Sequence, residues 1–175
     1  MRRANLKAGF FITRRVWFFV TLFVVSLANS SSPAASAAAA PPYKITAVRA
    51  MLFYNERGTF SRDILANPPF TLWNTIIGEG DAEAASYSTL VTVEVTGKLN
   101  PNEPPPARKV EFTATAGGQV LVKRTYDIAL GEGGKFHAPF WLYETGCRPI
   151  KVTARLVGQT QPSTMTKTLP FECGE

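Results

Sequence analysis

The chain has 175 residues, of which 45% are hydrophobic and 18% charged, and its formal net charge is +6 at pH 7. Five of the nineteen lysine and arginine residues precede residue 28, whereas all thirteen acidic residues follow it. The rest of the chain therefore carries a formal charge of only +1. Because the basic excess belongs to the amino terminus, it does not indicate a nucleic-acid partner, and we expect none.

Residues 1–28 have the composition of a secretory signal peptide. Basic residues precede an uncharged run of 13 residues, Val16–Ala28, and small residues follow it. That run is shorter than the roughly 20 residues that span a bilayer as a helix. We predict cleavage between residues 28 and 40 and a secreted or periplasmic protein. An uncleaved signal, which would tether the protein to the membrane, is the alternative.

The segment Thr13–Phe18 resembles a twin-arginine export signal, because Arg14 and Arg15 stand directly before the apolar run. The resemblance implies export of an already folded chain. The ordinary Sec route is the alternative, and the sequence favours it, since the run is very apolar and no lysine stands just after the motif. Residues 29–42, rich in alanine, serine and proline, are predicted to form a flexible tether.

Residues 43–175 are predicted to form one all-β domain. Apolar and polar residues alternate along most segments, and no long amphipathic helical pattern occurs. We expect strands at Tyr43–Tyr54, Thr59–Leu65, Phe70–Ile77, Ser88–Thr96, Lys109–Thr115, Gln119–Ile128, Phe136–Tyr143, Ile150–Val157 and Thr164–Cys173. Turn residues, such as the pair Gly117 and Gly118, separate them. Seven to nine short strands favour a β-sandwich of the immunoglobulin or fibronectin-III type.

The two cysteines, Cys147 and Cys173, are predicted to form a disulfide, because an exported chain folds in an oxidising compartment. Two unpaired thiols are the alternative. If the last two strands form a hairpin, alternation pairs Val152 with Leu169 and places Cys173 opposite Arg148. We therefore predict an irregularity such as a bulge at Gly146–Pro149 that lets the two sulfur atoms meet.

Acidic residues recur at every second position in a glycine-bearing segment, at Glu79, Asp81 and Glu83. Calcium is bound by six to eight hard oxygen ligands, often from alternating acidic side chains in such a loop. The segment lacks the spacing of an EF-hand loop and its final bidentate glutamate. We keep two interpretations, a calcium site and a connecting loop that its charges keep soluble, and the sequence favours the second.

The residue types needed for catalysis are scarce. His137 is the single histidine, which excludes a blue-copper site and disfavours a tetrahedral zinc site. The chain has no G-x-S-x-G nucleophile motif, and a disulfide would remove both cysteines as nucleophiles. The motif Gly131–Gly134 is predicted to be a turn, because no Gly-Lys-Ser/Thr follows it. We expect no catalytic residues and no cofactor beyond the possible calcium ion.

Aromatic residues give the second candidate site. In Phe140–Tyr143 every side chain is apolar, so both faces of that strand are apolar and only one can fill the core. Trp141 and Tyr143 on the other face, together with Trp73, are candidates for a surface that binds a protein or a sugar. Packing inside the domain is the alternative for either tryptophan.

These features predict an exported, non-enzymatic module that binds a protein partner in the cell envelope or outside the cell, or that supports an envelope assembly. The alternative is a small secreted hydrolase or a carbohydrate-binding module. Neither hypothesis of function requires a contact with the membrane. The amino-terminal signal would make one only if it is not cleaved.

Overall fold

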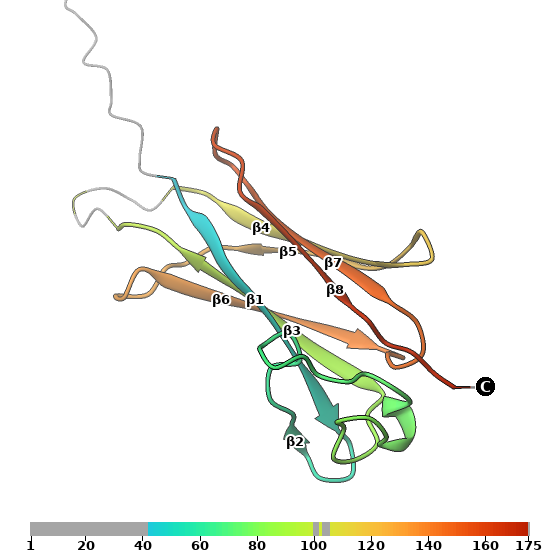
Figure 1. Ribbon diagram of the computed structural model, residues 1–175. Coiled ribbons are helices and arrows are strands. Elements are labelled where there is room, and N and C mark those ends of the chain that lie inside the picture. The colour runs from blue at the N-terminus through green and yellow to red at the C-terminus, as the bar shows by residue number, and fades with distance from the viewer. Residues whose placement is uncertain (1–41, 100–101, 103–105, 175) are drawn as a thin grey trace, which may run out of the picture. The chain divides into compact units, whose positions relative to one another are not determined.

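The computed structural model describes residues 42–99, 102 and 106–174. The predicted signal peptide and nearly all of the tether lie outside these residues. The described part is all-β, with two antiparallel sheets of four strands each and one 3-10 turn (Figure 1). Its elements are β1 (Lys44–Tyr54), β2 (Thr59–Phe60), η1 (Thr75–Ile77), β3 (Ser88–Thr96), β4 (Lys109–Ala116), β5 (Gln119–Asp127), β6 (Lys135–Tyr143), β7 (Ile150–Val157) and β8 (Thr164–Leu169). None of the described residues belongs to a helix with the length and apolar character needed to span a membrane.

The first sheet has the strand order β2-β1-β3-β6 and the second has the order β5-β4-β7-β8. Their inner faces share one core, as the alternation predicts. In β3 the side chains of Val91, Val93 and Val95 are all 0% exposed, whereas Glu94 and its outward neighbours are partly exposed. Phe112 of the second sheet stacks on Phe140 of the first, with ring centroids 4.0 Å apart. The prediction of a sandwich of short strands is therefore confirmed.

Glycine and proline, which disfavour regular strands, occur at positions of the sheets that tolerate them. Gly117 and Gly118 form the two-residue turn between β4 and β5, with φ values of 56° and 80°. Such a hairpin turn needs positive φ at both positions, which glycine adopts at little cost. Pro139 lies within β6, which continues through it and is an edge strand of the first sheet. An edge strand tolerates proline because its missing N–H need not enter a ladder on the open side.

The predicted strand at residues 70–77 is wrong. This segment is a loop that ends in η1, and Asn74 has a left-handed backbone with φ 44°. Phe70 and Leu72 are still buried, at 7% and 4% exposed, because the loop covers one end of the core. Its single bridge joins Trp73 to Glu172. The apolar pattern thus predicted burial but not the extended pairing.

The predicted strand Thr59–Leu65 is shortened to β2, and side chains continue the pairing beyond it. The Leu52 N–H donates to Ser61 Oγ at 2.9 Å, and the Ala50 N–H donates to Asp63 Oδ1 at 3.0 Å. Such side-chain acceptors compete with a regular ladder, which explains the early end of β2.

The β7–β8 hairpin forms, but its register differs by two residues from the prediction. Leu169 pairs with Ile150, and Met165 pairs with Ala154. A shift of two residues keeps every side chain on its predicted face, so alternation could not distinguish the two registers. Pairing also continues into the predicted loop, where the Leu156 N–H donates to Ser163 O at 2.9 Å. The last strand ends at Leu169, before Pro170, and not at Cys173.

Cys147 and Cys173 are joined as a disulfide, with their Cα atoms 4.7 Å apart. Cys147 lies in the connection between β6 and β7, and Cys173 lies beyond the end of β8. The irregularity predicted at Gly146–Pro149 is a bend outside the strands and not a bulge within a ladder. Gly146 has φ 136°, which favours glycine there.

Candidate functional site

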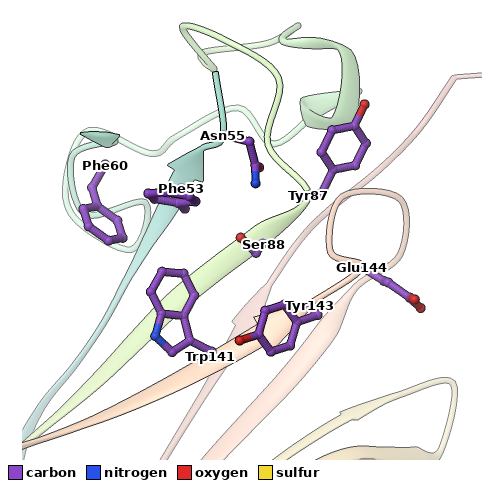
Figure 2. A pocket seen from close by; sticks show the side chains of 8 residues that line it. All are labelled: Phe53, Asn55, Phe60, Tyr87, Ser88, Trp141, Tyr143 and Glu144. Carbon is purple, nitrogen blue, oxygen red and sulfur yellow. The ribbon is translucent and has the colours of Figure 1, made fainter. Parts of the chain in front are cut away.

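A pocket of about 600 Å³ lies at one end of the outer face of the first sheet (Figure 2). The residues that line it are Phe53, Asn55, Phe60, Tyr87, Ser88, Trp141, Tyr143 and Glu144. Five of these eight are aromatic, and we call the site the aromatic pocket. Glu144 is the one charged residue among them.

Strand register brings these residues together from four segments of the chain. Phe53 pairs with Phe60 across β1 and β2, and with Ser88 across β1 and β3. Ser88 in turn pairs with Tyr143 of β6, while Trp141 pairs with Leu90 in the next row. Side chains alternate along a strand, so the row that contains Ser88 and the row that contains Trp141 both face outward. The residues between these two rows point to the other face and fill the core.

The rings of the pocket contact one another. The Phe53 and Trp141 centroids are 5.7 Å apart with planes at 90°, and Phe60 lies 5.3 Å from Phe53 and 5.9 Å from Trp141. The planes of Trp141 and Tyr143 are within 16° of each other, with centroids 6.4 Å apart. Edge-to-face and offset contacts of this kind are favourable, so the rings are held in place before any ligand arrives.

Three residues were predicted to form a binding surface, and the structure brings two of them together. Trp141 is 37% exposed and Tyr143 71%, whereas their neighbours Phe140 and Leu142 are each 2% exposed. Trp73 is 41% exposed but does not line the pocket. It lies beside the carboxyl-terminal segment, where it forms a bridge with Glu172 and its ring would contact a Cβ at Gly174.

Phe53, Phe60 and Tyr87 are pocket residues that the sequence did not single out. Phe53 lies on β1 before the turn at Asn55–Gly58, and Phe60 lies on β2 after it. Alternation within β1 places Phe53 on the outer face, because its neighbours Leu52 and Tyr54 are buried. This alternation is the sequence feature that could have indicated Phe53. Tyr87 carried no such signal, because it lies just before β3.

The three acidic residues considered for calcium do not share a ligand position. Glu79 Oε2 accepts a hydrogen bond from Asn74 Nδ2 at 2.7 Å, and Asp81 Oδ2 accepts one from the Thr71 N–H at 2.8 Å. Glu83 Oε2 pairs with Arg57 at 3.2 Å. Within the described residues, no group of three His, Cys, Asp or Glu side chains is placed to hold a metal ion. Each carboxylate instead fixes the loop locally.

Farther along the same sheet face, Glu94 collects several partners. Its Oε1 accepts a hydrogen bond from Thr46 Oγ1 at 2.9 Å, and Lys135, Arg49 and His137 lie 3.7, 3.8 and 4.0 Å from its carboxylate. The Thr46 hydrogen bond, and then the electrostatic effect of these basic side chains, lower the pKa of Glu94 against a desolvation cost that would raise it. The cluster is a surface ion-pair network on the outer face.

The described residues do not assemble a nucleophile with a base. His137 is on the outer face, its side chain is 54% exposed, and among the described residues no hydrogen bond links it to a serine. Both cysteines are bonded to each other. What the geometry offers instead is a preformed aromatic pocket with a few polar groups at its edge, an arrangement suited to binding.

The chain matches no protein-family model and no curated protein. Among solved structures it is similar to a putative β-galactosidase from Bacteroides fragilis, with 21% identity, a TM-score of 0.36, and coverage of 48% of this chain and 14% of that one. It is also similar to a Bifidobacterium dentium β-glucuronidase complexed with coumarin-3-O-glucuronide, with 13% identity, a TM-score of 0.40, and coverage of 74% and 18%. The chain thus spans less than a fifth of either protein, and a likeness this low does not bear on activity.

Proposed function

We propose that the protein is an exported, non-enzymatic β-sandwich module that holds a protein partner through the aromatic pocket. The observation that carries the proposal is a cluster of aromatic rings in contact, in which Phe60, Trp141 and Tyr143 are exposed to solvent and Phe53 is partly buried behind them. Aromatic residues at a surface pocket are the usual energetic centre of protein interfaces.

The strand order supports an immunoglobulin or fibronectin-III type of sandwich. With β1, β3 and β6 taken as strands A, B and E, they form one sheet. With β4, β7 and β8 taken as C, F and G, they form the other, and β5 adds a C′ strand beside C. This class of fold commonly serves as a binding or spacing module, although fold alone does not determine function.

Export is supported by two independent features. The sequence of residues 1–28 combines a basic head, a short apolar run and small residues after it. The disulfide between Cys147 and Cys173 suits an oxidising compartment. Together they favour a secreted or periplasmic location.

A protein partner fits the lining of the pocket better than most small polar ligands. Ser88 is buried, at 6% exposed, and donors and acceptors are few beside the five rings. The apolar part of a partner side chain would gain about 0.8 kcal/mol for each methylene group that these rings remove from water.

The test is affinity capture from envelope and medium fractions with the purified protein. The baits are the native protein and the variants Trp141→Leu and Trp73→Leu. Trp73 is the matched control, because the two tryptophans are similarly exposed, at 37% for Trp141 and 41% for Trp73, but only Trp141 lines the pocket. We expect specific proteins to be retained by the native and Trp73→Leu baits and lost with Trp141→Leu. Retention that is equal for all three, or turnover on a hydrolase panel that one carboxylate substitution abolishes, would contradict the proposal.

Carbohydrate binding is the second candidate, and one observation favours it. Trp141 and Tyr143 are nearly parallel and lie side by side on one strand, which resembles a flat platform for the apolar face of a sugar ring (Figure 2). A glycan array probed with the same three proteins decides between the candidates. Glycan retention that depends on Trp141 but not on Trp73 would establish the second.

A further inference from the structure

We propose that the occupant of the aromatic pocket is a positively charged arginine side chain of the partner, an inference that rests on the proposed function. It specifies the chemistry of the partner from four features of the site: the ring faces, the charge of the segment beside them, the contacts of the chain's own arginines and the side chain of Asn55.

The ring faces suit a flat cation. Trp141 and Tyr143 lie side by side with their planes 16° apart, and Phe53 stands perpendicular to Trp141 as a wall (Figure 2). The face of an aromatic ring is negative, and tryptophan binds cations most strongly among the aromatic side chains. A guanidinium is planar and weakly hydrated, so it can stack on such a face while its methylene stem contacts the Phe53 wall.

The segment that builds one side of the pocket is acidic. Residues 55–87 supply Asn55, Phe60 and Tyr87 to the lining. Five acidic residues against two arginines give this segment a formal charge of −3, the acidic positions being Glu56, Asp63, Glu79, Asp81 and Glu83. Glu144 lies at the edge of the pocket with its carboxylate directed away from the rings (Figure 2), and because it shares a neighbouring pocket with Arg148 it is left out of this charge. The local field therefore favours a cation at the mouth.

The two arginines of this segment are engaged elsewhere, and a third nearby arginine, Arg148, lies in a neighbouring pocket that it shares with Tyr143 and Glu144. Arg57 pairs with Glu83 at 3.2 Å and donates to the Glu83 carbonyl at 2.7 Å. Arg62 donates to the Pro68 carbonyl at 2.9 Å and lies over the Phe70 ring, 5.0 Å from its centroid. No lysine or arginine lines the aromatic pocket. The ring faces of Trp141 and Tyr143 are thus open to a cation supplied by another molecule.

Asn55 gives the site a polar contact for the same group. Its side chain projects between Phe53 and Tyr87 (Figure 2). An amide oxygen there can accept a hydrogen bond from one of the five N–H groups of a guanidinium. A lysine ammonium would meet the same charge but could not stack, which makes arginine the better fit.

The test compares two short peptides that differ only in charge, Ac-Gly-Arg-Gly-NH2 and the same peptide with citrulline, the neutral isostere of arginine. Binding to the full exported protein is followed by tryptophan fluorescence and calorimetry at low salt. We expect Kd for the arginine peptide to be lower by about fivefold or more than for the citrulline peptide, which corresponds to a cation–π contribution of about 1 kcal/mol. Trp141→Leu should remove the difference, and Trp73→Leu should keep it.

Equal affinity for the two peptides, or a difference that survives in Trp141→Leu, overturns the inference. Tighter binding of free choline than of the arginine peptide also overturns it, because the ligand would then be a quaternary ammonium group such as a lipid head group. Circular dichroism of each variant confirms folding before titration. The capture test of the proposed function does not depend on peptide charge, so loss of this inference and loss of that function give different results.

Discussion

At the scale of single residues, the aromatic pocket depends on which way each side chain of one strand points. Phe140 and Leu142 fill the core, and Trp141 and Tyr143, one position away, face outward. The same alternation in β1 separates Phe53 from the buried Leu52 and Tyr54. Because the partners in each row come from different strands, a change of one residue in register would empty the pocket.

Glu94 shows how a surface residue of the same face contributes to stability. Its pKa is lowered, first by the Thr46 hydrogen bond and then by Lys135, His137 and Arg49. A carboxyl group with a lowered pKa in the folded state stabilises the fold above its unfolded-state pKa. That contribution is lost as the pH falls through the lowered folded-state pKa.

Replacing Glu94 with glutamine should therefore lower the free energy of unfolding at pH 7 by up to about 1 kcal/mol. The difference between the two proteins should shrink as the pH falls below the ordinary pKa of a glutamate, about 4.3, and should vanish once the pH is below the lowered folded-state pKa of Glu94. Urea unfolding at pH 7 and pH 3 measures it. Glu56→Gln is the control, since Glu56 is exposed and has no ion pair within the described residues. A difference for Glu94→Gln that is the same at both pH values would refute the ion-pair account.

At the scale of elements, the edge of β1 is completed by side chains where β2 ends. Asp63 Oδ1 accepts hydrogen bonds from the Ala50 N–H and the Leu65 N–H, both at 3.0 Å. Ser61 Oγ accepts one from the Leu52 N–H at 2.9 Å. The bonds from Ala50 and Leu52 satisfy β1 donors that a longer β2 would have paired, and together these contacts fix the segment that follows Phe60.

The Asp63→Ala variant should lose about 1–3 kcal/mol of unfolding free energy, because two backbone N–H groups lose their acceptor. Chemical denaturation measures the loss. Asp127→Ala serves as the matched control, since the Asp127 side chain is 82% exposed in its pair with Lys109. Equal and small effects for the two variants would show that water replaces the Asp63 carboxylate.

The sequence predicted most strands, and its errors have a common physical basis. Period-two alternation located β3, β4 and β7 because their inner and outer faces differ in polarity. The segment 70–77 is also rich in apolar residues, but it covers the end of the core as a loop. Its side chains are therefore buried although its backbone pairs with no strand in a ladder. The two-residue error in the β7–β8 register preserved both faces, so polarity could not reveal it.

At the scale of the whole domain, two packed sheets and one disulfide hold the chain. Phe112 and Phe140 join the sheets, and the bond between Cys147 and Cys173 ties the β6–β7 connection to the segment after β8. The cysteines are 26 positions apart. A closed loop of this size restricts the unfolded chain and so favours folding.

Removing the disulfide with Cys147→Ser and Cys173→Ser together should reduce the free energy of unfolding by about 2–4 kcal/mol. The native protein under reducing conditions should show a similar loss, which separates the effect of the bond from that of the serines. Denaturant titration with and without reductant measures both. Ellman titration of the denatured, unreduced native protein should find no free thiol, and two free thiols would contradict the assignment.

The sequence predicted only part of the candidate site. Trp141 and Tyr143 were recognisable because both faces of their strand are apolar, which leaves one face unaccounted for by the core. Phe53, Phe60 and Tyr87 reach the pocket through pairing between distant strands, which the sequence does not display. The acidic loop left two interpretations open because spacing in sequence gives no information about the partners, such as Arg57 and Asn74, that bind each carboxylate.

The most direct test of the central claim is photo-crosslinking in the cells that make the protein, with p-benzoylphenylalanine in place of Tyr143 or, as a control, of Val120. Both positions are exposed, at 71% and 62%, but Val120 lies on β5, outside the aromatic pocket. We predict a discrete protein adduct at position 143 that is absent at position 120 and disappears when Trp141→Leu is added. Adducts of equal yield at the two positions, or no protein adduct at position 143, would contradict a pocket that holds a protein partner.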